Sequence, residues 1–246
     1  MNPSSIVSLV PSLTELLFDL GLEGQVKGRT RFCIHPKEKV KSVPIVGGTK
    51  TPNLEKIRQI NPDLIIANRE ENRKEHIEEL QKDFEVIVTE IGTIEEALFE
   101  IHEIGKKCGV SESAEKLIFD IQQELNCVPD VKPLTAAYLI WRKPWMSVGH
   151  DTYIHSVMQH WKLNNVYNER LRYPTITLEA LSLKKPDLIL LSSEPYPFKE
   201  KHIAEVSKIC SGSDIMLVNG EWFSWYGSRM LPAFRQLNAV RRTIGL

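Results

Sequence analysis

Few cysteines are present, and their spacing excludes several classes of protein. The 246-residue chain has four, at positions 33, 108, 127 and 210, and no two of them form a CxxC pair. Zinc ribbons and redox dithiols require such close pairs, and disulfide scaffolds require a higher density of cysteine in a shorter chain. We therefore predict four free, buried thiols.

An excess of charge of either sign is also missing. The chain has 31 Lys and Arg against 32 Asp and Glu. Proteins that bind nucleic acid or an anionic membrane usually gather basic residues on one face. The balanced charge therefore argues against both classes of partner.

Long hydrophobic runs are absent at the N-terminus. The stretch "SIVSLVPSLTELL" is interrupted by Ser8, Pro11 and Ser12, and no basic region precedes it. It is predicted to be neither a signal peptide nor a membrane-spanning helix, so the protein is expected not to be membrane-inserted. As written, the chain is expected to be cytoplasmic. The periplasm or cell envelope is the alternative if a leader has been removed.

Sequence motifs of common enzymes are not found. There is no GxSxG, no HExxH and no GxGxxG after a predicted strand. These motifs position a nucleophile, a zinc ion and a dinucleotide respectively. The sequence thus favours a protein that is not an enzyme and requires no cofactor.

The periodicity of apolar residues predicts an α/β fold. Strand-like runs such as "SIVSLV", "VPIVGG" and "PDLIIA" alternate with helix-like stretches over residues 1–92, which favours a parallel sheet. Residues 93–133 are predicted to be a helical connector, and the same alternation resumes over 134–246. Ser12 and Glu15 have the spacing of a capping box, which predicts Ser12 as the N-cap of the first helix.

Each half of the chain contains a copy of one short segment. "NLEKIRQINPDLIIA" begins at Asn53 and "TLEALSLKKPDLILL" begins at Thr177, an offset of 124 residues. In each copy the first residue predicts a helix N-cap, and Pro-Asp predicts the entry into a buried strand. Glu55 and Glu179 fall in the first turn of these helices. From the residues alone, they either complement the helix dipole, worth about 0.3–1 kcal/mol each, or serve a function.

Four stretches resemble one family of transport proteins. They are "IVSLVPSLTELLFDLGL", "NLEKIRQINPDLIIA", "TLEALSLKKPDLILL" and "EWFSWYGSRM", and they occur in the same order over nearly the whole chain. Together with the repeat, they resemble the helical-backbone (class III) periplasmic solute-binding proteins of ABC transporters. Within that family, the pattern is most similar to the cobalamin-binding protein and its iron-siderophore-binding relatives.

This resemblance implies two Rossmann-like α/β lobes with parallel sheets, bridged by a long α-helix, with the ligand in the cleft between the lobes. It implies a metal-chelate ligand, with a cobalamin-like corrinoid first and a ferric siderophore or haem second. It also implies delivery of that ligand to an ABC permease, whose basic pockets would receive Glu55 and Glu179. The protein would act as a monomer.

Loops that follow the strands are expected to contact the ligand, because open α/β sheets bind ligands beyond the carboxyl ends of their strands. Four of the five tryptophans fall in such loops, and aromatic faces suit a large flat ligand. In the first lobe the candidates are Arg31, Phe32, His35, Gly47, Gly48, Asn68 and Arg69. In the second lobe they are Trp145, His150, Tyr173, Trp222, Phe223, Trp225 and Arg229.

The loop "RTRFCIHP" is more polar than expected for a cobalamin receptor. Cys33 and His35 lie two residues apart, and a thiolate with an imidazole is a suitable pair of ligands for iron, zinc or cobalt. A metal site would need a further ligand from Glu70, His150 or His155. Otherwise Cys33 is a buried thiol and His35 a hydrogen-bonded imidazole. The polar loop leaves a second hypothesis open, a cytoplasmic corrinoid- or metal-handling protein of the same fold that is not coupled to a transporter.

Overall fold

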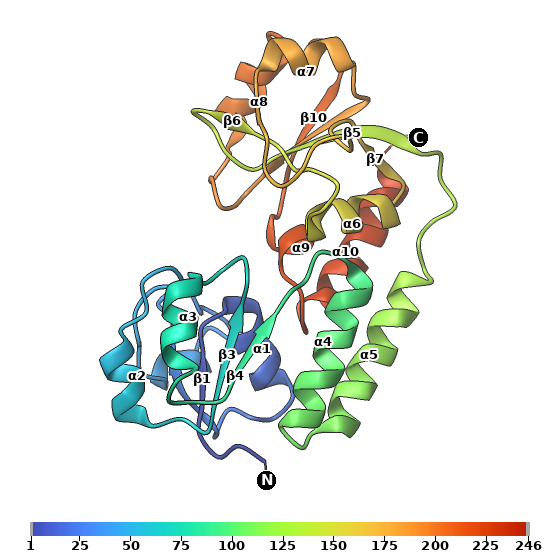
Figure 1. Cartoon of the computed structure of the whole chain (residues 1–246). Helices are drawn as coiled ribbons and strands as arrows, with labels where there is room; N and C mark the ends of the chain where they lie inside the picture. The colour runs from blue at the N-terminus through green and yellow to red at the C-terminus, as the bar shows by residue number, and fades with distance from the viewer. Residues whose placement is uncertain (1, 245–246) are drawn as a thin grey trace. The chain divides into compact units, whose positions relative to one another are not determined.

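The computed structural model describes residues 2–244, which fold into two compact units (Figure 1). The first unit contains the residues up to Ile91 together with Glu95–Asp120 and Tyr226–Arg229. The second contains Gly92–Ile94, Ile121–Trp225 and the residues from Met230 onward. By this grouping, most of the helical connector and a short C-terminal segment belong to the first unit. The boundaries drawn from the sequence, after residues 92 and 133, stay a prediction.

Four short parallel strands form the sheet of the first unit, in the order β2-β1-β3-β4. The strands are β1 (Ile6–Ser8), β2 (Val26–Arg29), β3 (Leu64–Asn68) and β4 (Val86–Thr89). They alternate with α1 (Pro11–Asp19), the 3-10 helix η1 (Lys39–Ser42), α2 (Leu54–Ile60) and α3 (Lys74–Leu80). Apolar residues of β1 and β3 are fully buried beneath Ile57 and Leu80, which explains why these strands read as continuous apolar runs.

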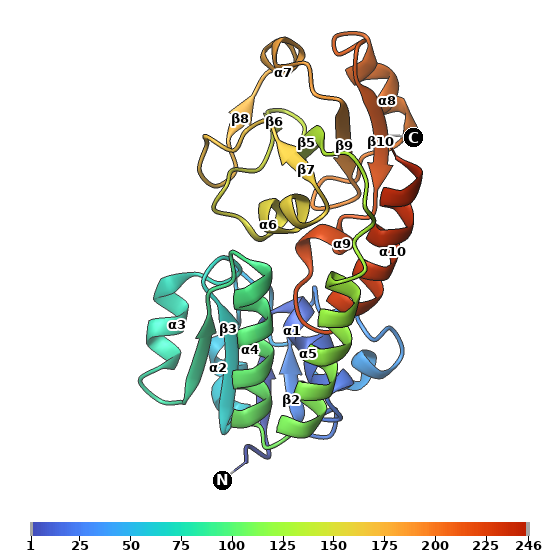
Figure 2. The same cartoon turned by 90° about the vertical axis from the view of Figure 1, so that its right-hand side faces the viewer.

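The predicted helical connector consists of two helices, α4 (Ile94–Lys107) and α5 (Ser111–Leu125). They lie side by side (Figures 1 and 2), and a Cβ atom at Gly105 would come within 2.3 Å of the Ala114 Cβ. Gly109, with φ of 73°, makes the turn between them. Because α5 has residues in both units, the chain passes from the first unit to the second along this helix.

The second unit repeats the β/α plan of the first. Its parallel sheet has the order β10-β9-β5-β7 and consists of β5 (Leu134–Leu139), β7 (Leu163–Asn165), β9 (Leu188–Ser192) and β10 (Asp214–Val218). An antiparallel pair, β6 (Trp145–Met146) and β8 (Thr175–Ile176), lies outside that sheet. The helices are α6 (Tyr153–His160), α7 (Leu178–Lys184), α8 (Glu200–Ser207), α9 (Glu221–Ser224) and α10 (Met230–Thr243). The predicted fold class of two parallel-sheet α/β lobes is confirmed.

The internal repeat of the sequence is also a repeat of structure. Helix α2 and strand β3 have the same lengths as α7 and β9, at the same offset of 124 residues. The Asn53 side chain accepts a hydrogen bond from the Lys56 N–H at 3.0 Å, and Thr177 accepts one from the Ala180 N–H at 3.1 Å. Both predicted N-caps are therefore confirmed.

The Asp of each Pro-Asp pair joins the repeat to its sheet. Asp63 accepts hydrogen bonds from the backbone N–H groups of Ser4 and Ser5 and from the Ser4 hydroxyl. Asp187 accepts from the backbone N–H and hydroxyl of Thr135. The hydrogen bonds donated by the hydroxyls have the larger effect, and those donated by the N–H groups the smaller. Both lower the pKa of the two carboxyls.

The first helix begins differently from the prediction. Val10, not Ser12, is the N-cap of α1, and Pro11 occupies the first turn. Proline is already fixed in a helical φ, so the helix starts at Pro11 and Ser12 lies inside it. Glu15 consequently forms no capping box and instead binds Arg229.

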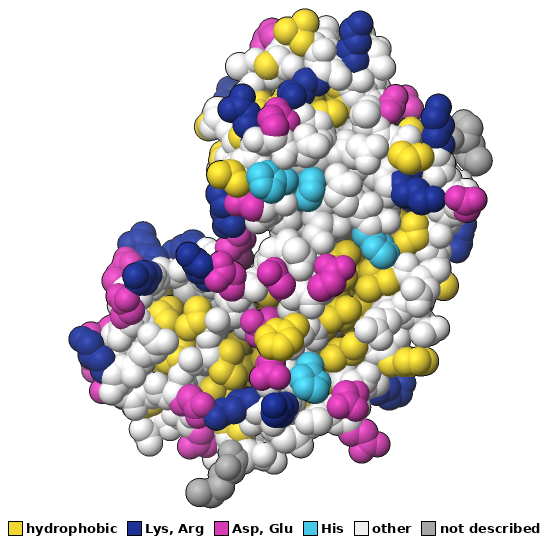
Figure 3. All heavy atoms as spheres, turned by 45° about the vertical axis from the view of Figure 1, so that its right-hand side comes forward, with side chains coloured by type: hydrophobic (Ala, Val, Ile, Leu, Met, Phe, Trp, Pro, Cys, Tyr) yellow, Lys and Arg dark blue, Asp and Glu magenta, His cyan; other side chains and the backbone are white. Residues whose placement is uncertain are grey.

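The four cysteines are free thiols, as predicted, although Cys127 is exposed while the other three are buried. Within residues 2–244, no helix combines the length and the apolar content needed to cross a bilayer. Basic and acidic side chains are interspersed on the face drawn in Figure 3. This distribution agrees with the balanced charge of the sequence.

Candidate functional site

Loops at the carboxyl end of β2 carry the first group of candidate residues. The buried Arg29 donates from Nε to the Val40 carbonyl at 2.8 Å and from Nη1 to the carbonyls of Thr30 and Cys33. These bonds hold the segment 30–40 against the strand. Beyond them Arg31 is exposed, and the Phe32 side chain is 54% exposed. Both side chains are accessible to a ligand.

Glycines shape the neighbouring loop. Gly47 has φ of 119°, and a Cβ atom there would lie 2.6 Å from the Thr51 carbonyl oxygen. Gly48 is buried against the Phe32 ring, where a Cβ atom would lie 3.5 Å from the ring. Gly47 therefore allows the loop to turn tightly, and the Phe32 ring lies against the backbone at Gly48.

Asn68 organises the loop after β3. It is 2% exposed, and its Nδ2 donates to the Thr89 carbonyl and hydroxyl at 3.2 and 3.0 Å. Its Oδ1 accepts from the N–H groups of Glu70 and Glu71. Both polar ends are thus used within the protein, while the next residue, Arg69, is exposed and pairs with Glu90. Asn68 therefore supports the loop, and Arg69 is accessible.

Cys33 is enclosed by hydroxyl groups. It is fully buried, and the Thr14 hydroxyl donates to its Sγ at 3.0 Å, with the Thr30 hydroxyl at 3.2 Å. Burial raises the pKa of the Cys33 thiol, which disfavours the thiolate that a metal requires. Within residues 2–244, no three His, Cys, Asp or Glu side chains are grouped as metal ligands. A metal site at Cys33 and His35 therefore stays a prediction from the sequence.

Glu15 of α1 and Arg229 form an ion pair next to this loop. Arg229 donates from Nε to Oε2 at 2.9 Å and from Nη2 to Oε1, and Glu15 is 8% exposed. Burial raises the pKa of the Glu15 carboxyl, while the guanidinium of Arg229 and then the charge of His35 act in the opposite direction. Arg229 was predicted as a ligand contact. No sequence pattern indicates its partner.

Aromatic candidates of the second unit are held by other rings and cations. The half-buried Trp145 stacks on Phe198 with ring centroids 5.9 Å apart and an angle of 9°. The guanidinium of Arg142 lies 5.9 Å from the Trp145 ring. Tyr173, also half-buried, has Arg172 5.6 Å from its ring. Cation–π and stacking contacts of this kind fix ring orientation.

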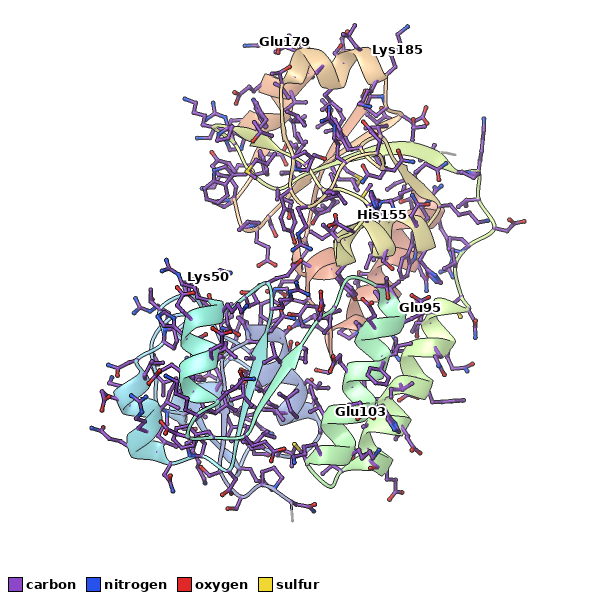
Figure 4. The ribbon with its side chains drawn as sticks, in the orientation of Figure 1. Lys50, Glu95, Glu103, His155, Glu179 and Lys185 are labelled. Carbon is purple, nitrogen blue, oxygen red and sulfur yellow. The ribbon has the colours of Figure 1, made fainter. Side chains whose placement is uncertain are left out.

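Two candidate histidines lie near α6: His150 precedes the helix and His155 is part of it. His150 is exposed, and His155 is half-buried on the helix (Figure 4). The side-chain amide of Asn165 lies 3.3 Å from His155 Nδ1 and donates to the Val148 carbonyl. Burial, and then the charge of His150, lowers the pKa of His155. A neutral His155 is therefore favoured, with Nδ1 facing an amide donor.

The candidates around α9 have different environments. Phe223 is 1% exposed and packs 5.0 Å from the Tyr138 ring, so it belongs to the core of the second unit. Trp222 is half-buried and lines a small apolar pocket with Trp161. Trp225 is half-buried, and its indole N–H is bonded to Glu194. Trp222 and Trp225 are thus partly accessible, whereas Phe223 is not.

Glu55 and Glu179 are both exposed in the first turn of their helices, as predicted. Arg58 donates to Glu55 at 2.9 Å and also contacts Glu79 and Asp83. Figure 4 shows Glu179 at one end of α7 and Lys185 at the other. The two carboxylates occupy equivalent positions of the repeat. Three residues after Glu55 the sequence has Arg58, whereas three residues after Glu179 it has Ser182.

Comparisons with known proteins agree with this architecture. A vitamin B12-binding protein from Pectobacterium carotovorum is 23% identical over 96% of this chain and 87% of its own length. The solved structure of the periplasmic vitamin B12 binding protein BtuF of Vibrio cholerae matches with a TM-score of 0.83 at 20% identity, over 98% of this chain and 97% of that one. The periplasmic heme-binding protein RhuT from Roseiflexus sp. RS-1 matches with a TM-score of 0.82 at 17% identity, over 98% of both chains.

The family assignment rests on a match that covers most of the chain. The model of the periplasmic binding protein family matches residues 6–208. This range includes both copies of the repeat and both parallel sheets except β10. The resemblance seen in the sequence is confirmed: the chain belongs to the periplasmic binding protein family.

Proposed function

We propose that this protein captures a metal-chelate ligand and delivers it to an ABC permease. The observation that carries the proposal is the family match over residues 6–208, which agrees with similarity to a vitamin B12-binding protein over 96% of the chain. Relatives in this family are binding proteins, and we propose that this chain likewise catalyses no reaction. A corrinoid is the first candidate ligand, and a ferric siderophore or haem is the second.

The surfaces that would contact the ligand are the loops that follow the carboxyl ends of the strands in each unit. The first unit contributes the exposed Phe32 and Arg31, and His35 at the edge of the same loop. The second contributes the half-buried rings of Trp145, Tyr173 and Trp225. Aromatic rings match the apolar area of a large chelate, and the arginine suits carboxylate or amide groups at its edge.

In a chelate the metal is already bound by the organic molecule. The protein would therefore contact the organic part of the ligand and not its metal. The raised pKa of the buried Cys33 thiol is consistent with this division, because burial disfavours the thiolate that would compete for the metal. His35 would donate or accept one hydrogen bond at the ligand's edge.

Delivery would use the two equivalent glutamates. Glu55 and Glu179 are exposed at the same position of the repeated helix, so a permease with two similar subunits would find one carboxylate for each. Glu55 would exchange its bond with Arg58 for a cation of the permease, at little cost because the pair is exposed. This role places the working protein on the outer side of the membrane that holds the permease.

Titration calorimetry with cyanocobalamin, haemin and a ferric hydroxamate siderophore tests the ligand class. Saturable binding of one of the three, with one ligand per chain, is expected. A folded protein that binds none of them would contradict the proposal. Fractionation of the native cells separates the transport role from the cytoplasmic alternative, because only the transport role requires the protein outside the cytoplasmic membrane.

A further inference from the structure

The loop after β9 places the carboxylate of Glu194 beside helix α9. Ser224 Oγ and Trp225 Nε1 each donate a hydrogen bond of 2.8 Å to the same atom, Oε1 of Glu194. Trp225 is the C-cap residue of α9. Hydrogen bonds to a carboxylate are stronger than those to a neutral acceptor, so this pair of bonds fixes the indole relative to the loop.

Gly220, in the loop after β10, leaves room for the Glu194 side chain to reach α9. Strands β9 and β10 are parallel neighbours, so the residues after them emerge at the same edge of the sheet. A Cβ atom at Gly220 would lie 2.5 Å from both Glu194 Cγ and Ser192 Oγ. Ser193 Oγ accepts a hydrogen bond from the Gly220 N–H at 2.9 Å. Glycine is therefore required for the carboxylate to reach α9.

We propose that Glu194 is a positioning residue for ligand binding, which holds the Trp225 indole so that its ring face contacts a flat conjugated macrocycle. The inference rests on the proposed function and narrows its ligand class. An indole has one hydrogen-bond donor, and Glu194 already occupies it. What Trp225 offers a ligand is thus its π face and apolar edge. A corrin or porphyrin ring presents a surface of that kind, whereas a siderophore folded around iron presents mainly polar edges.

Affinities for haemin and cyanocobalamin test this role. Glu194→Ala frees the indole and is expected to weaken binding of the macrocycle about tenfold. Glu194→Gln keeps an oxygen acceptor at the same place and should bind nearly as tightly as wild type. Ser224→Ala is the matched control, because it removes the other bond to the same oxygen and leaves the Trp225 bond intact. Equal losses in the Ala and Gln variants of Glu194 would overturn the proposal.

A double-mutant cycle with Trp225→Phe tests whether Glu194 affects ligand affinity through the Trp225 indole. Phenylalanine retains a ring face but has no N–H, so Glu194→Ala should cause little further loss in that background. If Glu194→Ala weakens binding equally with Trp or Phe at position 225, Glu194 acts independently of the indole and the proposal is wrong.

Fluorescence provides a test that needs no ligand. The difference between the wild-type and Trp225→Phe spectra isolates the emission of Trp225, which should shift to longer wavelength in Glu194→Ala and stay unchanged in Glu194→Gln. An unshifted Trp225 emission in Glu194→Ala would show that Glu194 does not hold the indole, and would overturn the proposal. A clear shift in a protein that binds neither macrocycle would instead count against the proposed function.

Discussion

Arg229 and Glu15, 214 residues apart in the sequence, form a two-point ion pair within the first unit. The pair fastens the segment Tyr226–Arg229 to α1. In the same segment Gly227, with φ of 88°, lies close to Leu16, where an added Cβ atom would be 3.3 Å from the Leu16 Cβ. A short piece of the C-terminal half is thus an integral part of the first unit.

Removing one member of this pair should destabilise the protein. Arg229→Ala leaves a mostly buried carboxylate without its cation, and we expect a loss of about 3 kcal/mol in the free energy of unfolding, measured by urea denaturation. The double variant Glu15→Gln with Arg229→Met removes both charges while keeping similar volumes, so it should recover most of the loss. An Arg229→Ala protein as stable as wild type would show that the carboxylate is adequately solvated.

The repeated aspartates should produce a defined pH dependence. The pKa of Asp63 and of Asp187 is lower in the folded protein than the unfolded value of about 3.9. Their contribution to stability is therefore complete above that value and is lost as the pH falls through the folded pKa.

The double variant Asp63→Asn with Asp187→Asn should unfold at lower urea concentration than wild type at pH 7. That difference should shrink below about pH 4, where the wild-type carboxylates become protonated. Asp214→Asn, which changes an exposed carboxylate at the start of β10, is the control and should unfold at the same urea concentration as wild type at pH 7. A difference that stays constant from pH 7 to pH 3 would contradict this account.

Local patterns were sufficient to predict the repeated segment. Asn53 and Thr177 cap their helices, and the Pro-Asp pairs lead into buried strands, because those outcomes depend on near neighbours in the sequence. Other assignments depended on distant residues. Glu15 has the spacing of a capping residue, yet its partner is Arg229, and Phe223 resembles its loop neighbours but fills the core beside Tyr138. Such outcomes follow from tertiary packing, which a single sequence does not display.

The two docking glutamates should be dispensable for folding and for ligand binding. Glu55→Ala with Glu179→Ala removes exposed carboxylates, so the cost in stability should be about 1 kcal/mol or less. Stimulation of the cognate permease's ATPase activity should be lost. Glu112→Ala, which removes another exposed first-turn glutamate, on α5, is the matched control and should stimulate normally. Impaired ligand affinity with normal stimulation would mean that the pair has a structural role.

Cys33 and His35 should respond differently to substitution. Cys33 is enclosed by the hydroxyls of Thr14 and Thr30, so Cys33→Ser should alter stability but leave the absorbance spectrum of a bound cobalamin or haem unchanged. A spectral shift in Cys33→Ser would show that the sulfur binds the metal.

His35 is half-buried and lies within range of the Glu15 charge. Because the role proposed for His35 is one hydrogen bond to the ligand, His35→Ala should weaken chelate binding about tenfold. Unaltered affinity for every chelate tested would remove the loop from the binding site.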